Sequence, residues 1–330
     1  MYKLILLFLI PLLSLGQASL FSLSQKKHDV VTHDVNNTIF LDLNTNIIDH
    51  LNNDKPCAIN LKTPFLNDQL LSLQLEYFEV ISSDFQLARS TEKGIIYDNY
   101  LPQTISYRIV NDDNLSGSIS IFKNTLMGVI KISGEVFEIV KIKNNTYTLF
   151  RVSDALTKSS FFCQTETGEI DNSVSNQSNI NMQRGGGDLY INIALDVDYY
   201  TYSSEFNSDC YAVLEWCVAI LAGVSECYMN ELNVGVQTNF IHVWETINDP
   251  YYYLPVNSAD FLYTFRDFWN STSPFTSVDR DVAMLLTNYN IGGRAFLDEL
   301  CNTNLSYAVS GVTENSPNYE SPTSYTYGLK

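Results

Sequence analysis

The stretch Arg280-Asp-Val-Ala-Met-Leu-Leu-Thr-Asn-Tyr-Asn-Ile-Gly-Gly-Arg-Ala-Phe-Leu-Asp-Glu-Leu-Cys301 decides how the second half of the chain is expected to fold. Val282 to Thr287 is a short apolar run, typical of a strand that is buried on both faces. Asparagines and glycines between residues 288 and 293 supply a turn. Arg294 to Leu300 is again rich in apolar residues. The pattern therefore predicts two strands joined by a turn, which an ordinary mixed sheet would also contain.

The elements before this stretch alternate between strand and helix patterns. Apolar residues recur every three or four positions from Cys210 to Leu232, which predicts a helix that Ser208 or Asp209 can cap. A strand–helix–strand–helix–strand order predicts an α/β domain over residues 186–330, built on a mixed sheet with helices. The expected elements besides that helix are strands at Tyr190–Val197 and Val236–Trp244 and a second helix at Asp260–Asn270.

The first half of the chain reads differently, as a β-rich domain over residues 19–185. Short apolar runs alternate with turn residues, as in a sandwich or barrel. A polar linker at about residues 159–187 closes this half and ends in Arg184-Gly185-Gly186-Gly187. The expected strands are Ile39–Leu43, Leu71–Ile81, Thr104–Val110, Gly117–Phe122, Leu126–Ile132, Val136–Ile142 and Tyr147–Val152.

Charge supports a boundary between the two halves. The 330 residues carry a formal net charge of −18, which disfavours nucleic acid as a partner. Residues 1–185 hold 15 basic and 19 acidic residues, a net of −4, and residues 186–330 hold 4 and 18, a net of −14. The change falls near Gly185 to Gly187.

The N-terminus indicates export. Leu4 to Leu15 is apolar, and Gly16 and Ala18 occupy the small-residue positions of a cleavage site. Residues 1–18 are therefore expected to be a secretory signal peptide, too short to span a membrane. No later segment is expected to span one either. The predicted location is secreted, or extracellular.

The order and spacing of residues from 280 to 301 resemble those of the reprolysin-like (adamalysin-type) metzincin zinc metalloproteases. That family carries a His-Asp-Asn-Ala-Gln-Leu-Leu-Thr block, a Gly-Leu-Ala strand and then a cysteine. The residues that match are Asp281, Ala283, Leu285, Leu286, Thr287, Gly293, Ala295 and Cys301, whereas Arg280, Val282, Met284 and Arg294 depart from the pattern. The resemblance covers about Asp188 to Lys330, and the β-rich half takes the position of the family's propeptide.

The resemblance implies a secreted zinc metalloendopeptidase that is made as a zymogen and acts on peptide or protein substrates, with its own propeptide as inhibitor. Zinc in this family is bound on a His-Glu-x-x-His-x-x-Gly-x-x-His helix, whose glutamate is the general base. The sequence contains no such motif, so this chain is expected to hold no catalytic residue and to be inactive by itself. The zinc ligands are expected beyond Lys330, in the catalytic domain of which residues 186–330 form the upper half.

Other roles follow residue by residue from the resemblance. The matching edge strand, which binds substrate as an added β-strand, is Gly293, Arg294, Ala295, Phe296 and Leu297. A possible calcium site combines Asn192, Asp281 and the Cys301 carbonyl.

Two further cysteine predictions concern pairing. Cys163 could be a cysteine switch that blocks zinc in the latent form, or a disulfide partner of Cys57. Cys210 and Cys217 would lie about 10 Å apart along one helix. A disulfide needs less than about 7 Å between Cα atoms, so we predict that these two are not bonded to each other.

Two alternatives stay open at this point. One is a secreted, non-catalytic binding protein on a protease-like scaffold. The other is a β-rich adhesion module joined to an unrelated α/β domain.

Overall fold

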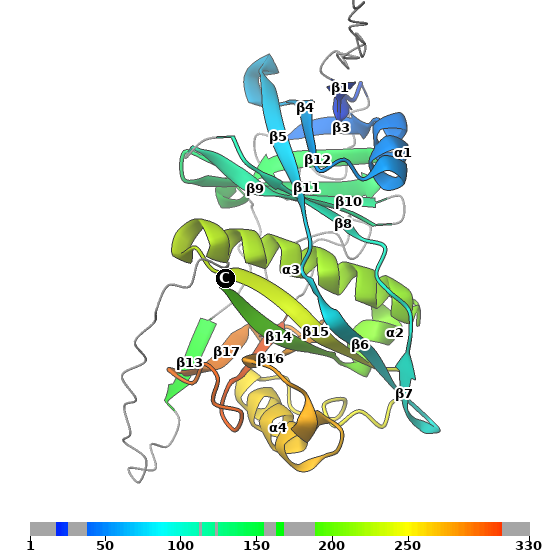
Figure 1. Cartoon of the computed structure of the whole chain (residues 1–330), viewed down its shortest axis with the longest axis vertical. Helices are drawn as coiled ribbons and strands as arrows, with labels where there is room; N and C mark the ends of the chain where they lie inside the picture. The colour runs from blue at the N-terminus through cyan, green and yellow to red at the C-terminus, as the bar shows by residue number, and fades with distance from the viewer. Residues whose placement is uncertain are drawn as a thin grey trace, which may run out of the picture.

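The structure is a computed structural model, and it describes residues 18–25, 38–111, 114–122, 125–154, 163–167 and 189–311. Two large mixed sheets dominate it, stacked with a long helix between them (Figure 1). The predicted signal peptide lies outside the described residues except for Ala18, and the predicted linker at about residues 159–187 does so except for residues 163–167.

The first sheet, here called the barrel sheet, is nearly barrel-shaped. Its strand order is β1-β4-β5-β8-β9-β10-β11-β12-β3-β2. The two strands at opposite ends of this order, β1 and β2, follow each other in the chain, and this brings the sheet close to closure. Their bounds are β1 Ala18–Ser19, β2 Phe21–Leu23, β3 Ile39–Leu43, β4 Ala58–Pro64, β5 Leu70–Phe78, β8 Ile105–Ile109, β9 Leu115–Phe122, β10 Thr125–Ile132, β11 Glu135–Lys143 and β12 Thr146–Arg151.

Apolar side chains fill the barrel sheet from within. Leu41, Leu75, Ile121 and Tyr147 are at most 1% exposed and belong to one cluster. Helix α1 (Thr45–Asp54) adds its buried Ile48 and Leu51 to this cluster.

The second sheet has the order β13-β17-β18-β16-β14-β15-β6-β7. Its five inner and central strands from β17 to β15 come from residues 190–311, whereas β13 at one end and β6 and β7 at the other come from earlier residues. The strand bounds are β6 Ile81–Thr91, β7 Gly94–Asp98, β13 Cys163–Thr167, β14 Tyr190–Val197, β15 Gly235–Trp244, β16 Val282–Thr287, β17 Gly293–Leu297 and β18 Tyr307–Gly311.

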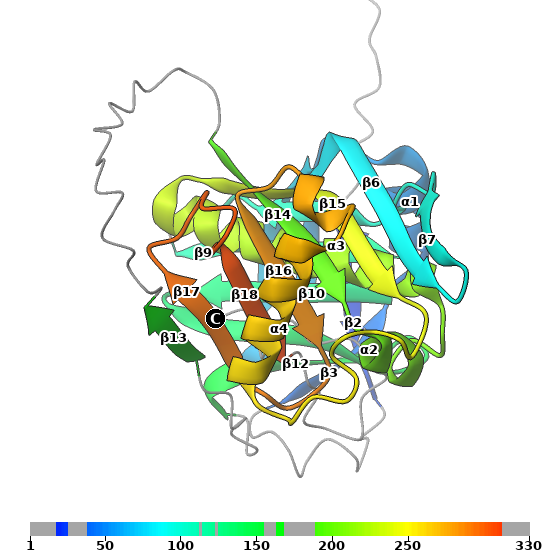
Figure 2. The same cartoon turned by 90° about the horizontal axis from the view of Figure 1, so that it is seen from below.

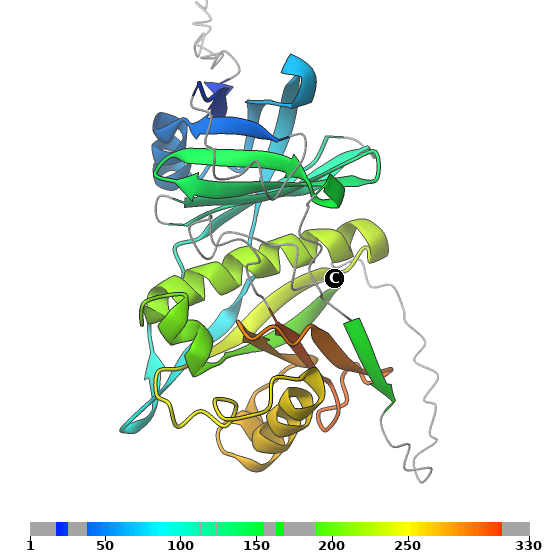
Figure 3. The same ribbon diagram turned by 180° about the vertical axis from the view of Figure 1, so that it is seen from behind.

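Helices cover both faces of the second sheet. Helix α3 (Cys210–Leu232) lies between the barrel sheet and the second sheet, and α4 (Ser258–Ser271) packs on the opposite face (Figures 1 and 3). Asp209 caps α3 by accepting a hydrogen bond of 3.0 Å from the Ala212 backbone N–H, one of the two predicted caps. The short helix α2 (Tyr199–Ser204) follows β14.

Helix α3 corrects one expectation from the sequence. It is long and apolar enough, by length and composition, to cross a membrane, although no later segment was expected to be. In the structure 83% of its most apolar window is buried between the two sheets, as in the core helix of a folded protein. Cys210 and Cys217 on this helix are both buried free thiols, which confirms that they are not bonded to each other.

The predicted fold class, an incomplete metzincin-like α/β sheet behind a β-rich domain, is wrong. The part of the chain that the structure describes is mostly β: 46% of its residues lie in strands, which form two large mixed sheets beside four α-helices. The reason is that the strand–helix alternation after residue 186 does not form a self-contained unit. The second sheet instead recruits β6, β7 and β13 from the first half of the chain. The boundary at residues 185–186 stays a prediction about processing.

Candidate functional site

Strand β17 is the predicted substrate-binding strand, and the structure places all five predicted residues, Gly293 to Leu297, within it. One side of β17 pairs antiparallel with β18, from Gly293–Ser310 to Ala295–Ala308. The other side pairs in parallel with β13 along the whole strand, from Cys163–Gly293 to Thr167–Leu297. Figure 2 shows β13 at this end of the sheet, beside β17. The strand that was expected to accept an added strand has therefore accepted one from its own chain.

Glycines shape the start of β17. Gly292 has a φ of 71°, in the left-handed region that favours glycine, and it turns the chain into the strand. Its carbonyl accepts a 2.8 Å hydrogen bond from the Gly311 backbone N–H, which ties the turn to the end of β18. A Cβ atom on Gly311 would lie 2.5 Å from the Tyr289 carbonyl oxygen, so this close approach of two backbone segments requires glycine.

Side chains anchor β17 to α4 and leave its backbone available for pairing. The Arg294 Nε donates a 3.0 Å hydrogen bond to Ser258 Oγ at the start of α4. Phe296 is 9% exposed and packs edge-on against Tyr263, at 5.8 Å between ring centroids. An arginine at position 294 therefore fits the strand, although the resemblance put an apolar residue there.

Cys163 begins β13 and lies opposite Gly293 in the register. Its side chain lies outside the described residues, so both its roles, cysteine switch and disulfide partner, stay predictions. Cys57, the proposed partner, is an exposed free thiol.

The three predicted calcium ligands do come together. The Asn192 backbone N–H donates to Asp281 Oδ2 at 2.8 Å, and the Cys301 thiol donates to Asp281 Oδ1 at 3.2 Å. The Asn192 side-chain oxygen accepts a 2.7 Å hydrogen bond from Gln237. Calcium takes about six to eight oxygen ligands, and the Asp281 carboxylate and the Asn192 side-chain oxygen accept protein hydrogen bonds here. The calcium site therefore stays a prediction, and in this structure the three residues join the start of β14 to the segment around Cys301.

A chain of hydrogen bonds crosses three neighbouring strands of the second sheet. Ser90 Oγ on β6 lies 2.8 Å from His242 Nε2 on β15, and His242 Nδ1 lies 2.7 Å from Asp196 Oδ1 on β14. The order Ser–His–Asp is that of a nucleophilic triad. Ser90 is only 4% exposed, however, and His242 and Asp196 are completely buried. Because substrate has no access to the serine, this network is structural.

Two further buried carboxyl groups, those of Asp198 and Asp249, belong to the surroundings of Asp196. Its Oδ2 accepts hydrogen bonds from the Tyr251 hydroxyl at 2.9 Å and from Trp269 Nε1 at 2.8 Å. Burial, and then the charge on Asp198, raise the pKa of Asp249. Burial likewise raises the pKa of Asp198, although Thr201 and Thr287 donate hydrogen bonds that favour its ionised form. These groups lie at the carboxyl end of β14, beneath α2.

The described residues do not fit a zinc ion. Within them, no three His, Cys, Asp or Glu side chains gather in a way that could hold a metal. His242 uses both ring nitrogens in the network above.

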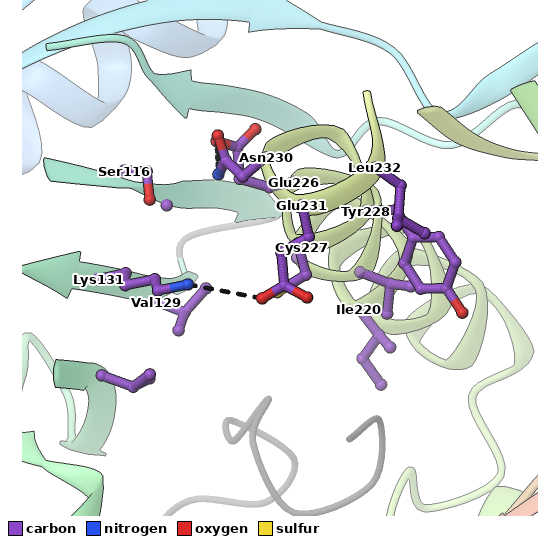
Figure 4. A pocket seen from close by; sticks show the side chains of 14 residues that line it. Ser116, Val129, Lys131, Ile220, Glu226, Cys227, Tyr228, Asn230, Glu231 and Leu232 are labelled. Atoms are coloured by element: carbon purple, nitrogen blue, oxygen red, sulfur yellow. Dashed lines mark hydrogen bonds and ion pairs between the residues drawn. The ribbon is translucent and has the colours of Figure 1, made fainter. Parts of the chain in front are cut away.

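A cavity of about 630 Å³ lies between the C-terminal half of α3 and strands β9 and β10 (Figure 4). Its walls are largely apolar, with Val129, Ile220 and Val224 among them, and the Lys131–Glu231 ion pair of 3.5 Å spans it. Glu226 on its wall is 4% exposed and its Oε2 has no hydrogen-bond partner among the described residues. Burial raises the pKa of Glu226 to about 6, partly offset by Asn230, Arg108 and the Gly117 backbone.

Sequence reasoning found β17 but not the strand that pairs with it. The segment around Cys163 reads as polar linker, because Gln-Thr-Glu-Thr shows no apolar alternation. Ser90 also gave no signal, since its role depends on β6 lying beside β15. The weak clue was His242, a histidine among the apolar residues of the second half of its strand.

Comparisons with known proteins add little. No protein-family model and no curated protein matches the sequence. Among solved structures, metalloproteinase-II from Bacteroides fragilis is similar with a TM-score of 0.40 and 7% identity, over 77% of this chain and 75% of that chain. At this TM-score the likeness assigns neither a fold nor an activity to the present chain.

Proposed function

We propose that this chain belongs to a secreted zinc metalloendopeptidase made as a zymogen, in which β17 binds an extended peptide and β13 occupies β17 until activation. The pairing of β13 with the full length of β17 is the observation that supports this proposal. An exposed sheet edge binds a peptide through main-chain hydrogen bonds, and the chain's own strand makes the same kind of contact.

The peptidase part of the proposal rests on the resemblance of residues 280–301 to metzincins. The described residues hold no zinc site, so no catalytic step is assigned to any of them. That same observation favours a second candidate, a secreted binding protein that captures peptides on β17 without cleaving them.

Blocking the pairing of β13 tests the peptide-binding step. Thr165→Pro combined with Glu166→Pro removes two successive backbone donors, of which one faces β17 in any register. A labelled peptide with the sequence of residues 161–167 should bind this variant and bind the unaltered chain about tenfold more weakly. The factor follows if β13 competes at an effective concentration on the order of 1 mM against an affinity of about 100 μM.

The control is Ser178→Pro, which falls in the same connector but outside β13. Equal peptide binding by all three proteins would refute the role of β17. Cleavage of casein by the protein as its host secretes it, abolished by a chelator, would support the peptidase. Peptide capture without any such cleavage would support the binding protein.

A further inference from the structure

Strand β6 is built into the second sheet more firmly than a covering strand would be. It lies between β15 on one side and β7 on the other. Its parallel pairing with β15 runs from Ile81–Thr238 to Ser90–Trp244. The Thr238 backbone N–H donates to the Val80 carbonyl at 2.7 Å, and the Glu245 N–H donates to the Ser90 carbonyl at 2.9 Å. Both ends of β6 are thus held to β15.

Side chains reinforce this contact. The Arg89 guanidinium makes a bidentate pair with Glu245, at 2.7 Å and 3.1 Å, and also bonds Asp98 of β7 at 2.9 Å. Arg89 and Glu245 are only 25% and 11% exposed, so the pair is largely shielded from water. Ser90 enters the buried network with His242 and Asp196. A planar, bidentate pair of this kind has defined geometry that a single ammonium contact lacks.

The chain that returns from β7 to the barrel sheet is clamped by Glu215 of α3. This carboxylate, 1% exposed, accepts hydrogen bonds from the Tyr100 hydroxyl at 2.7 Å, the Gln103 backbone N–H at 2.8 Å and the Thr104 backbone N–H at 2.7 Å. Among the described residues, the donors to both of its oxygens all come from the segment 100–104. Withdrawal of residues 100–104 would leave a charge buried without donors, which is strongly unfavourable.

Strand β13 occupies a different place in the same sheet. It forms the outer end of the strand order, and the backbone pairing described for it is with β17 on one side. The two segments that precede the predicted cleavage region therefore differ: β13 lies on one edge, while β6 is an inner strand with charged anchors.

From this difference we propose that the β15 edge, together with Glu245 and Glu215, is a permanent binding surface for residues 81–104 of the same chain. This inference rests on the proposed zymogen function. A cut between residues 183 and 187 then gives a protein of two chains that stay together. The N-terminal fragment stays bound through β6 and β7, and only β13 leaves its strand.

An inserted recognition sequence for a specific protease, between Gly185 and Gly186, tests this without the natural activation step. After the cut, the two fragments should elute together in size-exclusion chromatography at the mass of the uncut chain, 37.4 kDa, and should separate only in denaturant. Hydrogen exchange gives a second readout. Amides of residues 86–90 should stay as protected as those of β14, while amides of residues 164–167 should exchange much faster after the cut.

Variants identify the anchors. Glu215→Gln and Arg89→Gln should each weaken the association of the cut fragments about 30-fold or more, the range for truncating a buried charge pair. The matched control is Glu231→Gln, because the Glu231–Lys131 pair also links α3 to the barrel sheet but is 67% and 45% exposed. It should change the association less than about threefold.

Separation of the fragments without denaturant would overturn the inference, as would loss of protection at residues 86–90 on cutting. Should a variant fail to fold, the exchange measurement on the cut parent protein still decides. Fragments that stay together while β17 binds no peptide would refute the proposed function alone. Fragments that separate while β17 gains peptide binding would refute only the inference that β6 and β7 hold the N-terminal fragment in place.

Discussion

Removing the Asp196 carboxylate should destabilise the chain more than any surface change, because it would leave three buried donors without an acceptor. These are His242 Nδ1, the Tyr251 hydroxyl and Trp269 Nε1, at 2.7 Å, 2.9 Å and 2.8 Å. An unsatisfied buried donor costs about 1–3 kcal/mol, so Asp196→Ala should cost about 3–9 kcal/mol. Domains unfold with only about 5–15 kcal/mol. The variant should therefore be barely folded or unfolded at 25 °C.

Asp196→Asn keeps the shape and offers a milder change. Its oxygen can accept from Tyr251 and Trp269 while its amide donates to His242 Nδ1. The imidazole then takes the other tautomer and donates from Nε2 to Ser90 Oγ. The loss of the charged acceptor for His242 should lower the free energy of unfolding by about 1.5–3 kcal/mol, the range for one hydrogen bond to a charged group.

Urea unfolding followed by tryptophan fluorescence measures both variants, since Trp269 is completely buried in the parent protein. The control is Asp267→Ala on the same helix as Trp269, where the carboxylate is 66% exposed. It should change the free energy of unfolding by less than about 0.5 kcal/mol. An Asp196→Ala variant within about 1 kcal/mol of the parent would refute the argument that these donors depend on one carboxylate.

Three further outcomes are expected. Burial in the folded state raises the pKa of Glu226 from 4.5 to about 6, so the free energy of unfolding of the parent protein should fall as pH rises between these values. Glu226→Gln should therefore be more stable than the parent by about 2 kcal/mol at pH 8 but not at pH 4, which the midpoints of urea unfolding measure. Gly311→Ala should lower stability by at least about 2 kcal/mol, since its Cβ would meet the Tyr289 carbonyl oxygen; an unchanged melting temperature would contradict that clash. Limited proteolysis should cut first within residues 183–187, and N-terminal sequencing of early fragments that begin inside β14, α3 or β15 would contradict this.

Local pattern was sufficient where an element is defined by its own residues. The strands Tyr190–Val197 and Val282–Thr287 have the predicted bounds, and so does the helix Cys210–Leu232 with its Asp209 cap. Each has a long apolar run or a clear helical period. For the candidate site, the same local signal located β17 but did not locate its partner strand.

Elements without such signals were missed. Helix α1 buries only Ile48 and Leu51, and its N-cap Asn44 makes no side-chain cap bond, so neither periodicity nor capping marks it. Strand β18, Tyr307–Gly311, is a short strand that lies after the Arg280–Cys301 stretch, and its few apolar residues give no clear strand pattern. Both are stabilised by packing against residues that are distant in sequence, and this packing outweighs their weak intrinsic helix or strand propensity.

The segment Leu71–Ile81 shows why the fold class could not be read from the sequence. It was predicted as one strand, but β5 ends at Phe78 in the barrel sheet and β6 begins at Ile81 in the second sheet. What moves the chain from one sheet to the other is the Val80 carbonyl accepting from Thr238, a contact between residues far apart in sequence. No local pattern encodes that contact.

The chain thus crosses between the sheets at residue 80 and again at residues 100–104, and Glu215 fixes the second crossing. Both crossings precede the polar connector, so a cut at residues 183–187 leaves each of them intact. Activation by such a cut would therefore have to act on the sheet end that the connector itself supplies, which is β13 on β17. Under the proposed function, β13 is then the strand among those described that such a cut could release from β17, whereas β6 and β7 would remain in the second sheet.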